Sequence, residues 1–349
     1  MGIADNGESA SRGDQKNSSK IELRRIILGV IVSILSLAAV LYFADLGQLI
    51  NALRLADYRL IGYAVITTLI WLFIRTAFWR TLLREKAAFN DVFWAINEGY
   101  LINNLLPLRL GEFARAYLLS RKSVLTFWEI FSTIVIERVL DLTIAVGFLI
   151  GSIPVLVGGS LEWSVGLNTA ILVSTVLIVL FLLARYRELA FNTYRSLGTR
   201  FPLIFRIGGN AVPEFLHGLS VLTDGWRFVS AVGLAVLNWG FMILQYFILL
   251  RAFFPEAEWL WAVVTLTIAA LGMSAPSSPG ALGVYEAAVV GALQLFGVDA
   301  SIALAMAIST HLLQYLVTGV LGAYGLIRDG ESILGLFHRI RRFQPGTVR

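Results

Sequence analysis

The sequence predicts an all-α polytopic membrane protein, on three observations. First, 57% of the 349 residues are hydrophobic and 15% are charged, with a mean hydropathy of +0.76, whereas soluble domains average about 25% charged residues. Second, six mostly apolar runs without proline reach the length of about 20 residues that a spanning helix needs. Third, two more apolar stretches are interrupted by proline and glycine. We therefore predict six spanning helices plus two re-entrant or broken helical hairpins, about eight transmembrane segments in all.

In chain order, residues 1–25 are expected to be a disordered cytoplasmic tail, because they are rich in Gly, Ser, Asp and Asn without periodicity. A cleaved signal peptide is not expected, since the polar lead is too long. A single transmembrane domain over 26–328 and a basic cytoplasmic tail over 329–349 should follow. The predicted spans are 26–44, 60–82, 127–150, 166–184, 229–250 and 301–327.

The two interrupted stretches are 92–120, broken at Pro107, and 259–297, broken at "SAPSSPGALG". Each piece on either side runs roughly 15 residues, which is short for a full span. Paired short segments of this kind are typical of re-entrant hairpins or discontinuous helices.

The distribution of Lys and Arg predicts the orientation. With the N-terminus inside, the outer segments 45–59, 151–165, 251–258 and 298–300 hold only Arg54, Arg59 and Arg251, and the remaining Lys and Arg of the loops and tails fall inside. This asymmetry predicts that both termini are cytoplasmic, in the cell membrane.

The chain also resembles itself. "PLRLGEFARAYLL" at 107 and "PGALGVYEAAVVG" at 279 share a proline, a glycine four residues later and then a glutamate. With the predicted topology, one hairpin enters from the cytoplasm and the other from outside. We therefore expect an inverted repeat, with units at about 60–150 and 229–327, as in many secondary transporters.

The first hairpin carries polar residues of two kinds. Asn103 and Asn104 can cap the end of its first half-helix, and Gly111 can admit a close backbone. A role in shaping the hairpin tip does not explain Arg109, Glu112 and Arg115. Glu112 and Arg115 are three apart and can pair on one helical face. Charges at membrane depth usually serve a site or a hydrated cavity; the alternative is that these arginines snorkel to the cytoplasmic surface.

A second charged set lies in the next span, where Glu137, Arg138 and Asp141 fall about 15–21 Å along the helix that begins near Phe127. One interpretation is a neutral buried network that includes Arg109. The other is a partly hydrated cavity in which an arginine accepts an anionic head group.

The second hairpin offers hydroxyls at Ser277 and Ser278, and backbone N–H groups at Gly280 and Gly283 that can bind an anion at a half-helix start. Glu286 could carry a proton or pair with a buried arginine.

Four other polar residues in the spans are expected to have structural roles. Arg75 and Arg80 are expected to snorkel to the cytoplasmic interface. His311 and Gln314 are expected to form interhelical hydrogen bonds.

Several classes of function are excluded. The chain has no cysteine, its three histidines lie far apart, and it has no Gly-rich ATP-binding loop. We expect no catalytic or metal-binding residues, no cofactor and no ATP hydrolysis. The net charge of +5 fits the positive-inside rule and is not evidence for a nucleic-acid partner.

"NNLLPLRLGEFARAYLL", "ERVLDL" and "PSSPGALGVYE" together resemble the transmembrane region of lysylphosphatidylglycerol synthases, the flippase-like domain family. The resemblance covers about 26–328 and implies lipid handling through the motif residues named above, with Pro107 and Pro279. We do not expect aminoacyl transfer, because residues 329–349 are too few for the synthases' soluble transferase domain.

The resemblance implies a flippase or transporter for a lipid with a charged, anionic or phosphate-containing head group. The alternatives are a membrane enzyme that modifies a lipid head group, with Glu137 or Asp141 as acid or base, and a membrane scaffold for a separate lipid synthase or glycosyltransferase. The expected partners are membrane lipids, with a homo-oligomer or a separate lipid-modifying enzyme left open.

Overall fold

The computed structural model describes residues 31, 33–42, 44–106, 109–156, 163–200, 211–274, 278–333, 335, 336 and 339. Every regular element within these residues is helical, so the all-α class is confirmed. Four helices are long and apolar enough to cross a membrane: α3 (Tyr58–Leu82), α6 (Phe127–Leu156), α11 (Gly225–Phe253) and α14 (Ala300–Arg328). A fifth long helix, α7 (Trp163–Arg185), coincides with the predicted span 166–184.

The N-terminal part of the described chain is bent. The helix Ser33–Tyr42 meets α2 (Leu46–Leu55) at 88°, and counting this pair as one span raises the number of candidate spans from four to five. Part of the predicted span 26–44 lies outside the described residues. The count of six spans, and of about eight segments, stays a prediction.

Aspartates define the starts of four helices. The carboxylate oxygens of Asp45, Asp57, Asp224 and Asp299 accept hydrogen bonds from backbone N–H groups in the first turns of α2, α3, α11 and α14, at 2.8–3.3 Å. These N–H groups have no partner within the helix, so a side-chain cap stabilises the helix by about 1 kcal/mol. The acids at the ends of the apolar runs therefore mark where helices begin.

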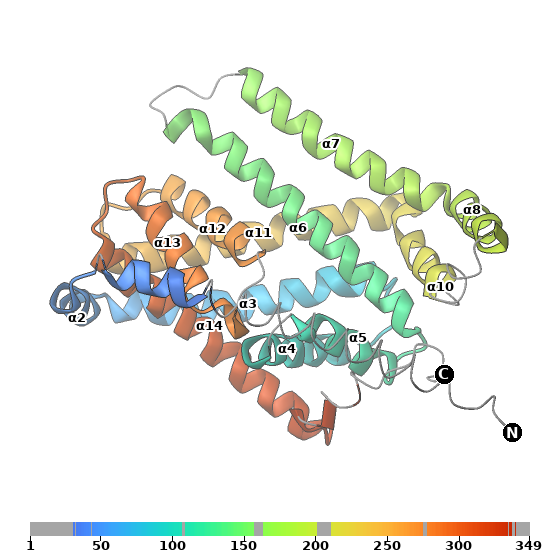
Figure 1. Cartoon of the computed structure of the whole chain (residues 1–349), viewed down its shortest axis with the longest axis horizontal. Helices are drawn as coiled ribbons and strands as arrows, with labels where there is room; N and C mark the ends of the chain where they lie inside the picture. The colour runs from blue at the N-terminus through green and yellow to red at the C-terminus, as the bar shows by residue number, and fades with distance from the viewer. Residues whose placement is uncertain are drawn as a thin grey trace, which may run out of the picture.

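Two helical hairpins occupy the interrupted stretches. The first joins α4 (Phe89–Leu105) to α5 (Leu110–Ser120), and the second joins α12 (Trp259–Ser274) through η2 (Pro279–Ala281) to α13 (Val284–Gln294). At 11 residues, α5 and α13 are each roughly 16 Å long and too short to span a bilayer. The hairpins approach each other from opposite ends of the long helices (Figure 1), and α4 contacts η2. Their relation as an inverted repeat stays a prediction.

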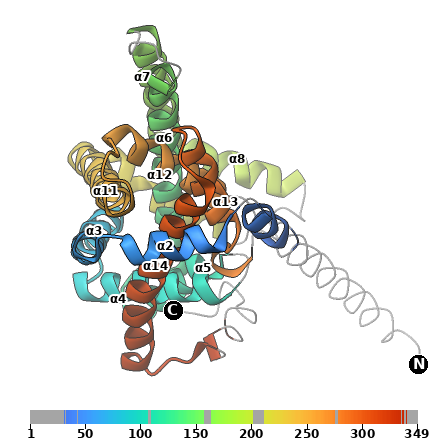
Figure 2. The same cartoon turned by 90° about the vertical axis from the view of Figure 1, so that its left-hand side faces the viewer.

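The long helices hold the hairpins in place. α3 packs along α11, and α14 packs along α4. α3 and α11 are antiparallel, because the Asp57 N–H donates to the Ala252 carbonyl at 3.0 Å, near the start of one helix and the end of the other. α6 and α7 form a further pair whose far ends project beyond the other helices (Figure 2). One apolar cluster surrounds the first hairpin and another surrounds the second.

The predicted loop 185–228 is largely helical where it is described, with α8 (Arg187–Arg200), α10 (Ala211–Gly218) and η1 (Leu219–Thr223). Beyond α14, Asp329 pairs with Lys122 and Glu331 pairs with Arg121 at 2.5 Å. These pairs join the end of α5 to the end of α14. Burial tends to raise the pKa of Asp329, but its polar contacts with Glu98 and Lys122 outweigh burial and hold the pKa below its ordinary value.

Candidate functional site

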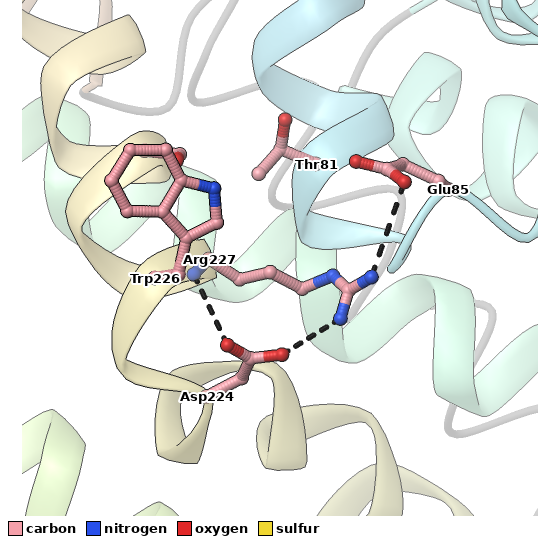
Figure 3. Close-up of a pocket in the computed structure, with 6 residues that line it drawn as sticks. Thr81, Glu85, Asp224, Trp226 and Arg227 are labelled. Carbon is pink, nitrogen blue, oxygen red and sulfur yellow. Dashed lines mark hydrogen bonds and ion pairs between the residues drawn. The ribbon is translucent and has the colours of Figure 1, made fainter.

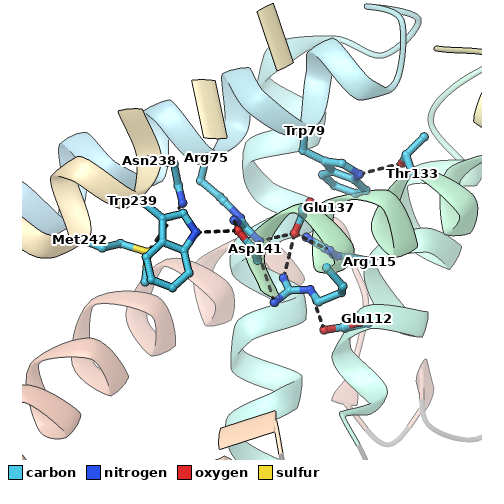
Figure 4. A network of polar contacts seen from close by, with 11 residues as sticks. Arg75, Trp79, Glu112, Arg115, Thr133, Glu137, Asp141, Asn238, Trp239 and Met242 are labelled. Carbon is cyan, nitrogen blue, oxygen red and sulfur yellow. Dashed lines mark hydrogen bonds and ion pairs between the residues drawn. The ribbon is translucent and has the colours of Figure 1, made fainter. Parts of the chain in front are cut away.

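Glu137 is the centre of a network of charged side chains (Figure 4). It lies on α6, is fully buried, and its Oε1 atom accepts hydrogen bonds from guanidinium groups on three helices. The donors are Arg75 of α3, Arg115 of α5 at 2.9 Å and Arg138 of α6 at 2.8 Å. A buried carboxylate without such partners would be strongly destabilising, and the three arginines offset this cost of burial.

Asp141 lies one helical turn beyond Glu137 and extends the network to α11. Its two oxygens accept hydrogen bonds from Arg75 at 3.1 and 2.9 Å, a bidentate arrangement. The indole N–H of Trp239 also donates to it, at 3.2 Å. The network therefore ties α3, α6 and α11 together at one point.

Glu112 completes the network from the first hairpin. It lies 3.2 Å from Arg138 Nε, and Arg138 also lies 3.7 Å from Asp141. The predicted pairing of Glu112 with Arg115 is wrong, because Arg115 turns to Glu137 and its guanidinium stacks over Trp79 at 4.6 Å. Three arginines (Arg75, Arg115, Arg138) face three carboxylates (Glu112, Glu137, Asp141), so the formal charges cancel. Arg109, which the neutral-network interpretation included, forms no ion pair with them.

The network is closed on one side and open on the other. The side chains of Glu137 and Arg75 are 0% and 3% exposed, whereas those of Arg138 and Glu112 are 32% and 19% exposed. Arg138 is therefore the most exposed member of the network, ahead of Glu112 and of Asp141 at 15%.

Arg109 lies beside this open side without a carboxylate partner. It starts α5 in a left-handed conformation with φ of 53°. Its guanidinium donates to the backbone carbonyl of Met273 near the end of α12, and it is exposed. It interacts electrostatically with Arg138 and Glu112, yet no carboxylate among the described residues lies within 4.0 Å of it. Among the described residues, the meeting point of the two hairpins therefore carries a guanidinium group without an ion-pair partner.

Arg75 corrects a prediction made from the sequence. It was expected to snorkel to the interface, but it is 3% exposed and ion-paired with both Glu137 and Asp141. Its depth could not be judged along its own helix, because both carboxylates belong to α6, more than 60 residues away. Arg80 instead donates to the carbonyl of Ala87 at 3.1 Å, next to the end of α3.

The sequence predicted that the asparagines of the first hairpin cap the end of α4, but their side chains bond elsewhere. Asn103 Oδ1 accepts a hydrogen bond from the Gly111 N–H at 2.7 Å, so it caps the start of α5. Asn104 donates to Thr318 of α14 at 3.3 Å. Pro107 lies outside the described residues. Both asparagines thus hold the tip of the hairpin in shape.

The second hairpin uses its own polar groups. The Gly283 N–H, expected to be free for an anion, donates to Glu286 at 2.6 Å. Ser278 donates its backbone N–H to Ser33 at 3.0 Å and its hydroxyl to Leu282 at 3.2 Å. Ser277 lies outside the described residues. Glu286 pairs with His311, not with an arginine, and His311 forms the predicted interhelical hydrogen bond.

A separate polar hollow of about 480 Å³ lies where α3 ends and α11 begins (Figure 3). Arg227 is already paired there with Asp224 at 2.7 Å and lies 3.9 Å from Glu85. The exposed Trp226 stands at its edge. Because its charges satisfy one another, the hollow is a weaker candidate site than the open network. No group of three or more His, Asp or Glu among the described residues could hold a metal ion.

A family model described as the lysylphosphatidylglycerol synthase TM region matches residues 26–322. The chain belongs to this family. The match covers both hairpins and every residue of the charged network, and it establishes a multi-pass integral membrane protein. The family assignment made from the hairpin motifs is therefore confirmed.

Curated relatives extend the comparison. The chain is 24% identical over 324 residues to a UPF0104 membrane protein of Methanocaldococcus jannaschii, covering 88% of this chain and 96% of that protein. It is 24% identical over 328 residues to a UPF0104 membrane protein of Methanothermobacter thermautotrophicus, covering 87% and 95%. It is also 25% identical over 344 residues to the glycosyltransferase AglD of Haloferax volcanii, covering 88% of this chain and 55% of that protein. No solved structure matches the chain.

Proposed function

We propose that this member of the lysylphosphatidylglycerol synthase TM-region family moves a lipid with an anionic head group between the leaflets of the cell membrane, without ATP hydrolysis. The proposal includes the orientation predicted from Lys and Arg, with both termini cytoplasmic. It also takes residues 26–328 as one lipid-handling domain.

The observation that carries the proposal is the guanidinium of Arg109, which has no ion-pair partner in the described part of the chain, at the contact between the two hairpins. A charge at membrane depth is expensive and is retained where it serves a pathway or a hydrated cavity. The neighbouring network is neutral as a whole and exposes Arg138 beside it. An incoming phosphate or carboxylate would therefore meet two guanidinium groups, which bind such anions through paired hydrogen bonds.

The packing offers a reason why lipid movement needs no nucleotide. Among the described residues, Arg109 of the first hairpin donates one hydrogen bond to the second hairpin, to the carbonyl of Met273. A head group that binds Arg109 can replace this contact, so its arrival favours separation of the hairpin tips. Movement of one hairpin against the other would then expose the charge alternately to the two sides, as in transporters built from broken helices.

The network argues against the enzyme alternative. Glu137 accepts from three arginines, and Asp141 accepts from Arg75 and Trp239. Carboxylates whose oxygens already accept hydrogen bonds from guanidinium and indole donors are poorly placed to exchange a proton with a substrate. The name of the glycosyltransferase relative belongs to a longer protein, of which this chain matches 55%.

The test is reconstitution of the purified chain into liposomes that contain fluorescently labelled lipids. A membrane-impermeant quencher added outside measures the labelled lipid that has reached the outer leaflet. We expect anionic lipids to equilibrate much faster with the protein than without it, and zwitterionic lipids to be little affected. Mass spectrometry of the recovered lipids should show them unmodified.

Two results would contradict the proposal. If labelled anionic lipid equilibrates at the protein-free rate, the chain does not move such lipids under these conditions. If the recovered lipids carry a new covalent group, the chain is an enzyme that acts on them.

A further inference from the structure

His311 stands between two hydrogen-bond acceptors at the second hairpin. It is the twelfth residue of α14, roughly 17 Å along that helix, and it is buried. Its Nδ1 atom lies 2.6 Å from Glu286 Oε1, and its Nε2 atom lies 3.0 Å from the carbonyl oxygen of Gly280. Both distances are those of hydrogen bonds.

The protons of this arrangement can be counted. A neutral imidazole carries one N–H and one acceptor nitrogen, whereas an imidazolium carries two N–H groups. The Gly280 carbonyl can only accept, so Nε2 must carry a proton. The second contact, between Nδ1 and Glu286, then also needs a proton, and a neutral histidine beside an ionised glutamate cannot supply it. A neutral imidazole and an ionised carboxylate hold one proton between them. The two contacts together need two, so the geometry requires one more proton.

The groups around this proton favour its place on His311. Glu286 is held as an acceptor by the Gly283 N–H, which donates to its other oxygen at 2.6 Å. Among the described residues, the remaining titratable groups that face the pair are phenols: Tyr285 and Tyr315, whose rings lie 4.4 Å from the imidazole, and Tyr246, which hydrogen-bonds to Tyr285 at 2.7 Å. The pair with one added proton is neutral on either side chain, and the Gly283 N–H, which stabilises the ionised carboxylate, places that proton on the imidazole.

This proton also holds the hairpin tip to α14. The Gly280 carbonyl accepts from His311 Nε2 and from the Tyr315 hydroxyl, at 2.6 Å. Gly280 has a φ of 65°, and a Cβ there would lie 1.5 Å from the Tyr315 hydroxyl, so this approach to α14 needs glycine. The same Cβ would lie 3.3 Å from the Asn104 carbonyl, so the tip also touches the first hairpin.

Loss of the proton weakens one of the two contacts of His311. If Nδ1 keeps its hydrogen bond to Glu286, Nε2 becomes a lone pair that faces the lone pairs of the Gly280 carbonyl, and the contact turns repulsive. The tip that touches the first hairpin would then lose one of its two ties to α14. Proton release and separation of the hairpins are thus linked by a single hydrogen bond.

We infer that His311 and Glu286 form a proton-binding site that drives lipid movement, one proton being bound when the hairpins meet and released when they separate. The inference deepens the proposed function and rests on it, since it names the ion whose gradient would supply the energy. The proton leaves His311 Nε2 for water on the side to which the separated tips open, and a proton from the other side restores the imidazolium.

The first experiment reads the proton without transport. The full chain, with ¹⁵N-labelled histidine, is placed in lipid nanodiscs and the imidazole nitrogens are observed by NMR at neutral pH, with His311 assigned from the His311→Gln variant. We expect both ring nitrogens of His311 to carry protons, and the signature to be lost in Glu286→Gln. A neutral His311 with one protonated nitrogen in the wild type would overturn the inference.

The second experiment reads the coupling in the liposome assay with a pH difference imposed across the membrane. We expect the gradient to make the distribution of anionic lipid asymmetric, a protonophore to abolish the asymmetry, and His311→Gln to be insensitive to the gradient. His217→Gln is the control, because His217 lies on α10 with its side chain 54% exposed, and it should respond like the wild type.

The outcomes separate the two claims. If the wild type moves lipid equally with and without the gradient, proton coupling is wrong and lipid movement stands. If the wild type moves no lipid in any condition, the proposed function fails and the coupling fails with it, while the NMR measurement still decides whether the pair holds a proton.

Discussion

At the scale of single residues, the burial of the Glu137 carboxylate depends on arginines from three helices. Its Oε1 atom accepts from all three, and its Oε2 atom is buried without a hydrogen-bond partner among the described residues. Arg75 and Arg115 are equally buried, but Arg75 also carries both guanidinium hydrogen bonds to Asp141. It should therefore contribute the most to stability.

Arg75→Met should destabilise the protein strongly. It removes one of the three arginines from Glu137 and both guanidinium hydrogen bonds from Asp141, and breaking a buried ion pair typically costs about 3–5 kcal/mol. The measurement is the thermal midpoint of unfolding in detergent, with Arg59→Met as the control, since Arg59 is exposed on the same helix. Equal midpoints for the two variants would show that the network adds little to stability.

Arg138 should matter for transport more than for folding. Arg138→Gln leaves Glu112 with an unbalanced charge, whereas the double variant Arg138→Gln, Glu112→Gln restores neutrality. We expect the single variant to lower the unfolding midpoint and the double variant to recover most of it. Both should move anionic lipid slowly, because the exposed guanidinium is gone. A double variant that moves lipid at the wild-type rate would assign Arg138 a structural role only.

At the scale of the elements, the first hairpin is held by direct contact between its two backbones. A Cβ atom on Gly111 would lie 1.9 Å from the Gly99 carbonyl oxygen and 2.7 Å from the Asn103 side chain. Both obstacles belong to the opposite arm of the hairpin, and the backbone one cannot rotate away. The close approach of α4 and α5 therefore depends on this glycine.

Gly111→Ala should prevent normal assembly of the hairpin. The arms must move apart, which breaks the Asn103 cap and displaces Arg115 and Glu112 from the network. The fraction of monodisperse protein in size-exclusion chromatography should fall sharply. Gly62→Ala is the matched control, because a Cβ there meets nothing within 4 Å and alanine favours the helix by up to about 1 kcal/mol. Normal behaviour of Gly111→Ala would show that the close contact of the arms is not required.

The sequence predicted both hairpins but not their contacts with distant segments. Apolar length and the Pro/Gly interruptions predicted the long helices and both hairpins, because these signals lie within one segment, but not the helices of the 185–228 loop. Contacts between distant segments leave no such signal, so Arg75 was assigned to the interface and Glu112 to Arg115. The pairing of His311 with Glu286 was also not predicted, although each is a polar residue in an apolar helix. Their meeting depends on how α13 packs on α14.

At the scale of the whole molecule, the predicted orientation places the loop between α11 and α12 outside and α8 inside. The chain has no cysteine, so single cysteines report position without background. Glu256→Cys, at an exposed site in the 254–258 loop, should react with an impermeant maleimide added to intact cells. Glu188→Cys, with a side chain 80% exposed on α8, should react only after the cells are opened. The reverse pattern would invert the topology.

The central claim concerns the molecule as a whole: the charge of Arg109, where the two hairpins meet, receives the anionic head group. Its most direct test is the rate of anionic lipid movement in liposomes for Arg109→Gln against the control Arg59→Gln. A hydrogen bond to a charged group contributes about 1.5–3 kcal/mol, so we predict that Arg109→Gln lowers the rate at least about tenfold. Arg59→Gln should match the wild type, and both variants should remain folded. A folded Arg109→Gln protein that moves anionic lipid at the wild-type rate would contradict the claim.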